Sequence, residues 1–216
     1  MNLRSPRPGR TTARRRDQAR ALFRDGILEA AERVFAERGV QATRIQDIAQ
    51  RARVAVGTVY NHFDSKDDVL GALIDERAQE MVACLGRQPD DPPAFRPAFE
   101  RRVERVLRYA DGHRGFCALL LAHGLGNGQP DPGRVLNPKA RRRVEKLRSA
   151  WLALVDEGQA DGALAMLERN QLASFFGGAV RSVILSDDFE ATPSLPELAA
   201  LVARLVLDGA ATRRAS

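Results

Sequence analysis

Residues 43–70 read TRIQDIAQRARVAVGTVYNHFDSKDDVL, and this stretch decides the fold. The apolar positions of residues 43–52 recur at the spacing of one helix face, which predicts a short helix. Residues 53–55 interrupt the pattern, and residues 56–63 predict a second helix that is too short to be stable alone. A short helix, a three-residue turn and another short helix have the geometry of a helix-turn-helix.

Polar side chains mark the beginnings of two of the predicted helices. Thr43 followed by Gln46 has the pattern of a capping box, in which the two side chains bond free N–H groups of the first turn. Ser65 followed by Asp68 predicts the start of a long helix directly after the second short one. The free face of residues 56–63 carries hydrogen-bonding side chains, which suits entry into the major groove of DNA.

At these residues the sequence resembles the DNA-binding domain of the TetR family of bacterial regulators. The resemblance lies in Thr43, Ile48, Ala49 and the run VAVGTVYNHFDSKDDVL at residues 54–70, and it covers roughly residues 20–72. It implies that the two short helices and the next helix start contact DNA through Thr43, Arg44, Val56, Gly57, Thr58, Tyr60, Asn61, His62 and Lys66. Core packing is the alternative for Tyr60, and exposure without a contact is the alternative for His62.

Two positions depart from the usual pattern of that family. Arg53 stands where the family usually has Gly and where the turn favours a positive φ, which costs an arginine about 1 kcal/mol. A phosphate contact would compensate, so Arg53 joins the predicted DNA contacts. Ala55 stands where a serine commonly caps the second short helix, so roughly 0.5–2 kcal/mol of capping is forfeited.

The positive charge is concentrated in the first third of the chain. The 216 residues have a net charge of +6, whereas residues 1–63 alone hold thirteen arginines, no lysine and six acidic residues. A basic segment beside a helix-turn-helix indicates a polyanionic partner, double-stranded operator DNA. Residues 1–16 lack apolar periodicity, and we expect a disordered basic arm that either follows phosphates or has no defined role.

The whole sequence has helical patterns, so the expected fold class is all-α with about nine helices. Residues 17–64 predict a three-helix DNA-binding domain with its helix-turn-helix at about residues 43–63. Its first helix is expected over residues 17–38, ended by Gly39. Residues 65–216 predict a larger helical domain, and the resemblance implies that this domain binds a ligand and forms a homodimer.

Within the larger domain, the resemblance implies a ligand cavity and a two-helix dimer interface. Large apolar residues are the candidates for the cavity, although most of them would equally serve as core: Phe95, Phe99, Phe116, Leu120, Trp151 and Phe175. Residues 163–186 and 195–208 predict two strongly apolar helices. Their stripes are the candidates for the interface, with an intrachain core as the alternative for part of each: Leu172, Phe176, Ala179, Val183, Leu198, Val202 and Leu205.

Other classes of protein fit the sequence less well. It has no Gly-rich phosphate loop, GxSxG elbow or Cys/His signature, so we expect no enzyme and no cofactor. Cys84, Cys117, His113 and His123 include no close ligand pair, which argues against a metal site. No run of about 18 apolar residues occurs and no apolar segment follows the basic start, so we expect a cytoplasmic protein without a membrane partner.

Taken with the resemblance, these features predict a one-component transcriptional regulator, a repressor that an unknown small-molecule effector releases from operator DNA. The alternative is a DNA-binding regulator without such a ligand, controlled by a protein partner or by redox state. An architectural DNA-binding protein would explain the basic segment but not the almost neutral remainder with its own core.

Overall fold

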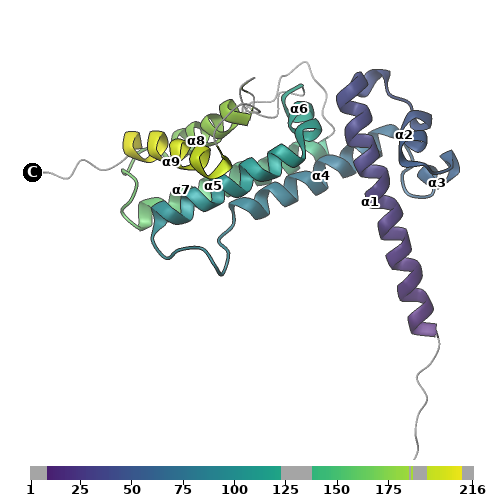
Figure 1. The fold of residues 1–216 in the computed structure, drawn as a ribbon, viewed down its shortest axis with the longest axis horizontal. Coiled ribbons are helices and arrows are strands. Elements are labelled where there is room, and N and C mark those ends of the chain that lie inside the picture. Colours follow the sequence, from purple (N-terminus) through teal and green to yellow (C-terminus); the bar gives the residue numbers. More distant parts are fainter. Residues whose placement is uncertain (1–8, 123–137, 185, 187–193, 211–216) are drawn as a thin grey trace, which may run out of the picture. The chain divides into compact units, whose positions relative to one another are not determined.

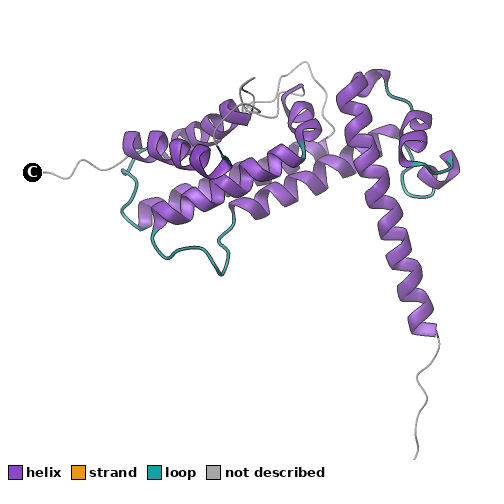
Figure 2. Ribbon diagram, in the orientation of Figure 1, coloured by secondary structure: helices purple, strands orange, loops and turns teal. Residues whose placement is uncertain are grey.

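The computed structural model describes residues 9–122, 138–184, 186 and 194–210. Over these residues the chain forms nine helices and no strand, which confirms the predicted all-α class (Figures 1 and 2). The contacts within the chain divide it into two compact units, Met1–Leu73 and Ile74–Ser216, which we call unit 1 and unit 2. None of the described helices is long and apolar enough to cross a membrane.

Unit 1 consists of three helices and the start of a fourth: α1 (Gly9–Ala42), α2 (Ile45–Ala52), α3 (Val56–Tyr60) and α4 (Lys66–Leu85). Helix α1 packs on α2, and α2 packs on α3. Every helix contributes at least one fully buried apolar side chain to the core: Leu28, Phe35, Ile48, Val59 and Leu73. The short α3 is therefore held by its neighbours, as its length requires.

Helix α1 differs from its prediction at both ends. It begins at Gly9, so the expectation of a disordered arm is wrong for residues 9–16. Residues 10–25 contain neither Pro nor Gly and are rich in good helix formers, and a helix that is already nucleated extends through them at little cost. Gly39 interrupts the helical geometry with a φ of 76°, as predicted, but helical hydrogen bonding resumes and continues to Ala42.

Helix α4 begins where the sequence predicts and crosses from unit 1 into unit 2. The Ser65 hydroxyl accepts a hydrogen bond from the Asp68 N–H at 3.1 Å and donates one to the Asp68 carboxylate at 2.7 Å. This arrangement satisfies a backbone donor that the first helical turn leaves free. The first turns of α4 belong to unit 1, with Val69 buried, and the helix from Ile74 onward belongs to unit 2.

Unit 2 contains the rest of α4 and five further helices: α5 (Phe95–Gly112), α6 (Arg114–Ala122), α7 (Pro138–Ala160), α8 (Arg169–Ile184) and α9 (Leu195–Ala210). Helix α5 lies at the centre, since it packs on α6, α8 and α9, while α7 packs on α8. The Phe99 and Phe176 rings meet edge to face, with their centres 5.5 Å apart. These contacts join α5 and α8 in one apolar core.

Helix α8 begins at Arg169 rather than at residue 163 as predicted. Gly162 has a φ of 73° and turns the chain after α7, so the apolar residues that follow are not yet helical. Leu164 packs closely over Gly158, where an added Cβ would lie within 3.0 Å of the leucine side chain. The Glu168 carboxylate then accepts hydrogen bonds from the N–H groups of Asn170 and Gln171 and starts the helix.

Ion pairs hold the connection between α4 and α5 and join α5 to α7. The Arg105 guanidinium donates to Asp91 at 2.6 Å and to the Gly86 carbonyl at 2.9 Å. Arg102, only 2% exposed, donates to both oxygens of Glu157 at 2.7 and 3.0 Å. The hydrogen bond from Arg105 lowers the pKa of Asp91 from 3.8 to about 2. We call these four side chains the Arg102–Asp91 network.

Candidate nucleic-acid interface

The turn between α2 and α3 is closed by backbone hydrogen bonds. The Arg53 N–H donates to the Gln50 carbonyl at 3.2 Å, and the Val54 N–H donates to the Ala49 carbonyl at 3.0 Å. This pairing is the Schellman motif, which places one residue in the left-handed region. That residue is Arg53, with a φ of 57° and a ψ of 40°, so the positive φ expected at this position is present without a glycine.

Helix α3 has an inner face that anchors it and an outer face that is open. Val59 and, directly after the helix, Phe63 are buried in the core of unit 1. Gly57 and Asn61 are exposed, and Tyr60 is 51% exposed. The Tyr60 ring is therefore not part of the core. A Cβ added at Gly57 would meet no atom within 4 Å, so packing inside the protein does not require this glycine.

The other residues predicted to contact DNA differ in how far they are exposed. Val56, Thr58 and His62 are half-buried, and Arg44 and Arg53 are exposed. Helix α3 begins after Ala55, whose side chain makes no capping hydrogen bond, as expected from its methyl group. The structure thus brings eight of the ten predicted residues to the surface of α2, the turn and α3.

Thr43 is placed differently from its prediction. Its side chain is only 2% exposed, and its hydroxyl donates to the Gly39 carbonyl at 2.8 Å. The first residue flanking α2 is Arg44, whose N–H donates to the Asp47 carboxylate at 2.9 Å. The predicted capping pair of Thr43 and Gln46 is therefore wrong by one position, because the buried threonine bonds the preceding helix instead.

Lys66 also has a role inside unit 1. Its ammonium donates to the carbonyls of Val40, Gln41 and Thr43, at 2.7, 3.2 and 2.9 Å. These are the carbonyls at the end of α1 and of the connection to α2, where the helix dipole favours a cation. An ammonium group has three donors, and all three are used here. We call this arrangement the Lys66 clamp.

His62 lies near two arginines of α1. Burial lowers the pKa of its imidazole, and the positive charges of Arg20 and Arg24 lower the pKa further. The Arg24 guanidinium carbon lies 5.9 Å from the centre of the neighbouring Phe63 ring. The end of α3 therefore adjoins the Arg-bearing half of α1, where burial and positive charge both disfavour the protonated imidazole.

In unit 2 the predicted cavity residues belong to different clusters. Phe95, Phe99 and Trp151 belong to the main core, whereas Phe116 belongs to a separate cluster with Met81 and Cys117. Phe175 is 56% exposed, so its assignment to the cavity is not supported by its position. The side chain of Leu120 lies outside the described residues. In the described part of the chain, no group of three His, Cys, Asp or Glu could hold a metal ion.

The predicted interface residues are mostly intrachain core. Leu172, Phe176, Leu198 and Val202 are buried, and Ala179 and Val183 are half-buried against the same core. Leu205 is 65% exposed. Two further large apolar residues of these helices are exposed, Phe175 at 56% on α8 and Leu201 at 37% on α9.

The Arg102–Asp91 network was missed at the level of sequence. Arg102 follows Phe95 and Phe99 at helix spacing and precedes Val106, so it stands on the apolar stripe of α5. A charged residue on such a stripe signals a buried ion pair.

Comparisons with known proteins give matches over the segment that contains the helix-turn-helix. Residues 27–73 match the model of the tetR family of bacterial regulatory proteins. The HTH-type transcriptional repressor Rv3405c of Mycobacterium tuberculosis is 40% identical over 120 residues, covering 55% of this chain and 57% of the relative. The HTH-type transcriptional repressor KstR2 of Rhodococcus jostii is 40% identical over 67 residues, covering 28% and 33%. The chain thus spans little more than half the length of the first of these relatives and a third of the second.

Solved structures share the fold over most of the chain. The fatty acid degradation regulator FadR of Bacillus halodurans superposes with a TM-score of 0.68 at 23% identity, covering 87% of this chain and 95% of that one. FadR of Bacillus subtilis, in complex with stearoyl-CoA, superposes with a TM-score of 0.66 at 20% identity, covering 85% and 97%. At these identities the likeness concerns the fold.

Proposed function

Because residues 27–73 of this chain match the model of the tetR family of bacterial regulatory proteins, we propose that the protein is a one-component transcriptional regulator that binds operator DNA. The observation that carries the proposal is the outer face of α3, which is polar, open and held from behind by Val59 and Phe63. A helix presented in this way fits the major groove. The proposed contacts are Arg44, Arg53, Val56, Gly57, Thr58, Tyr60, Asn61 and His62; the buried Thr43 and the clamped Lys66 are left out.

The proposed regulator acts as a homodimer. Apolar side chains left open on α8 and α9 support an interface there, with Phe175, Leu201 and Leu205 at its centre. Leu201 and Leu205 are one helical turn apart and so share a face of α9. A two-fold dimer would present two α3 helices to half-sites about 34–36 Å apart, one turn of DNA.

The proposed control is release of a repressor from DNA by a small molecule bound in unit 2. Helix α4 belongs to both units, so a ligand that changes its position would change unit 1 as well. The ligand can act only through its different affinity for the two arrangements, with a typical coupling of about 1–3 kcal/mol.

A regulator controlled by redox state or by a protein partner is the second candidate. Burial raises the pKa of the Cys84 thiol, and Cys117 is buried, so neither has the accessible thiolate that a redox sensor needs. Control by a small molecule or a protein partner is accordingly favoured over a redox switch.

The function is tested by selecting duplexes from a random-sequence library with the full-length protein. We expect a palindromic site with half-sites about 10 base pairs apart, and no selection by the Asn61→Ala variant at unchanged helix content. Stearoyl-CoA is the first effector probe, because it is bound in a structure of the same fold. Release by this probe must be matched by equally weakened probe binding when the selected duplex is present. A library that yields no common sequence would contradict the regulator function.

A further inference from the structure

The first half of α1 reaches beyond the helices on which the second half packs. The described side chains of residues 14–23 are all exposed, and the buried positions of α1 begin at Ile27. Figure 1 shows α1 running on past α2 and α3 within unit 1. This free half of the helix therefore has a surface that the fold itself does not use.

Three arginines form a ladder along one side of this free half. Arg16, Arg20 and Arg24 follow each other at four-residue steps, and the next step is the buried Leu28. Residues four apart lie on one face of a helix. The ladder thus runs on from the buried part of α1, past the edge of the core.

The Arg24 end of the ladder lies beside the end of α3. The Arg24 guanidinium carbon is 5.9 Å from the centre of the Phe63 ring, and the charges of Arg20 and Arg24 act on His62. Phe63 and His62 come directly after α3 (Val56–Tyr60), the helix proposed to enter the major groove. The ladder is therefore continuous with the proposed DNA contacts.

Arg16 and Arg20 differ from Arg38 and Arg51 in their partners, whereas Arg24 has an ion pair with Asp25 at 3.7 Å. Arg38 pairs with Asp47 at 2.8 Å, and Arg51 pairs with Glu37. Among the residues that the structure describes, Arg16 and Arg20 have no acidic partner. Arginines that the fold leaves to solvent are available to an external anion, and guanidinium groups suit phosphate oxygens.

We propose that Arg16, Arg20 and Arg24 bind the phosphates of duplex DNA beside the half-site that α3 contacts. This inference rests on the proposed function. The ladder spans about 12 Å at 1.5 Å per helical residue, which corresponds to roughly three phosphates of one strand. Duplex DNA is favoured over an anionic membrane because the ladder starts at the proposed DNA-contacting face.

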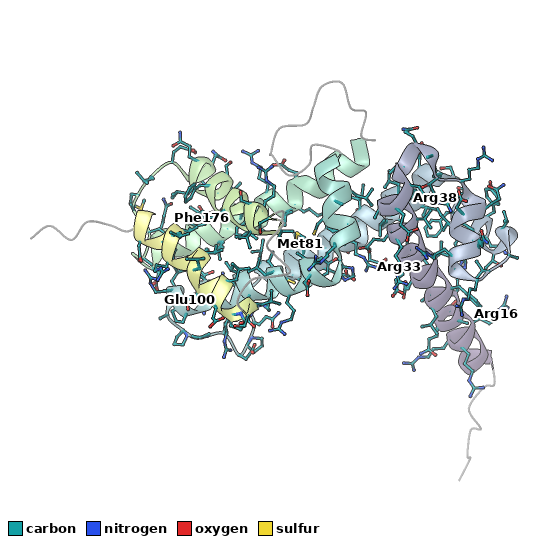
Figure 3. All side chains as sticks on the ribbon, turned by 45° about the horizontal axis from the view of Figure 1, so that its top comes forward. Arg16, Arg33, Arg38, Met81, Glu100 and Phe176 are labelled. Carbon is teal, nitrogen blue, oxygen red and sulfur yellow. The ribbon has the colours of Figure 1, made fainter. Side chains whose placement is uncertain are left out.

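The test compares two double variants of the full-length protein with the same loss of charge. Arg16→Gln with Arg20→Gln removes two steps of the ladder, and Gln keeps the helix propensity close to that of Arg. Arg15→Gln with Arg33→Gln is the matched control, because these exposed residues are 18 apart and share the face turned away from the ladder. Figure 3 marks Arg16 in the free half of α1 and Arg33 in the packed half.

Binding of a mixed-sequence duplex of roughly 40 base pairs is measured between about 50 and 200 mM KCl. We expect the ladder variant to lower the slope of log K against log salt by about 0.9 for each phosphate contact, close to about 2 per protomer. The control variant should keep the wild-type slope. Equal slopes for the two variants would overturn only the proposal that the ladder binds phosphates. A wild-type protein that binds no duplex would overturn both that proposal and the proposed regulator function. A ladder variant that loses only binding to phosphatidylserine vesicles would assign the ladder to a membrane and also overturn the proposal.

Discussion

Each of the two units secures a chain connection with cationic side chains, but these cations have different partners in the two units. In unit 1 the Lys66 clamp bonds three backbone carbonyls at the end of α1. In unit 2 the Arg102–Asp91 network bonds two carboxylates, Asp91 and Glu157. Carbonyls do not titrate and carboxylates do, so the Lys66 clamp should tolerate acid that weakens the Arg102–Asp91 network. A further difference is that unit 1 relies on one lysine, whereas unit 2 relies on two arginines, Arg102 and Arg105.

The largest effect is expected for Arg102→Ala in unit 2. The change removes two hydrogen bonds to Glu157 and leaves a cavity where a side chain only 2% exposed had packed. Breaking a buried ion pair costs about 3–5 kcal/mol of the free energy of unfolding. The measurement is denaturant unfolding followed by the fluorescence of Trp151, which lies in the core of unit 2.

Arg101→Ala is the control for this variant. Its side chain is 50% exposed beside Asp90, so its loss should cost less than about 1 kcal/mol. Equal destabilisation by the two substitutions would show that the network adds nothing to an ordinary surface charge.

The second effect is expected for Lys66→Met in unit 1. Methionine keeps the apolar stem but leaves the carbonyls of Val40, Gln41 and Thr43 without their donor, at a cost of about 2–3 kcal/mol. Faster amide hydrogen exchange in α1 and α2 would report the loss. Lys146→Met, at an exposed position of α7, is the control.

The same Lys66 variant separates a clamp from a phosphate contact. If Lys66 acts only as a clamp, its loss lowers DNA affinity by destabilising unit 1, and the slope of log K against log salt stays as in the wild type. A phosphate contact would lower that slope by about 0.9. A reduced slope with unchanged hydrogen exchange would return Lys66 to the DNA-contacting set.

The third effect is acid sensitivity in unit 2. The pKa of Asp91 is lowered from 3.8 to about 2, chiefly by the hydrogen bond from Arg105. A lowered folded-state pKa contributes stability above pH 3.8 that is lost as the pH falls through about 2, here about 2 kcal/mol. Unfolding of unit 2 between these pH values should show the loss, and Asp91→Asn should remove most of that pH dependence. A wild-type profile as flat as that of the variant would disprove the assignment.

The two units also differ in how far their sequences predicted them. In unit 1, Ile48, Val59 and Phe63 follow helical spacing, and the turn residues agree with one local motif, so the helix-turn-helix followed from the sequence. Thr43 was misassigned because a buried hydroxyl can bond the preceding helix as well as the next one. The start of α1 was missed because charge density suggested disorder where helix propensity prevailed.

In unit 2 the apolar stripes predicted the helices but not what covers each stripe. Leu172 and Leu198 bury against their own chain, and Phe175 stays open, although all three looked alike in sequence. Periodicity gives the apolar face of a helix and not its partner. Arg102 shows the same limit, since its carboxylate lies 55 residues away on α7.

The smallest effect is expected at the turn of unit 1, for Arg53→Gly. Arg53 has a φ of 57°, a conformation that costs a non-glycine residue about 1 kcal/mol or more, while glycine adds some entropy to the unfolded chain. The net gain in the free energy of unfolding should be up to about 1 kcal/mol. If Arg53 contacts a phosphate, the same variant should lower the slope of log K against log salt by about 0.9 per protomer. Stability and DNA affinity would then move in opposite directions, which neither Lys66→Met nor Arg102→Ala can produce. Arg53→Asn is the control, because asparagine tolerates the left-handed region and lacks the charge. A more stable Arg53→Gly protein with undiminished affinity would show that the arginine is tolerated at the turn rather than used there.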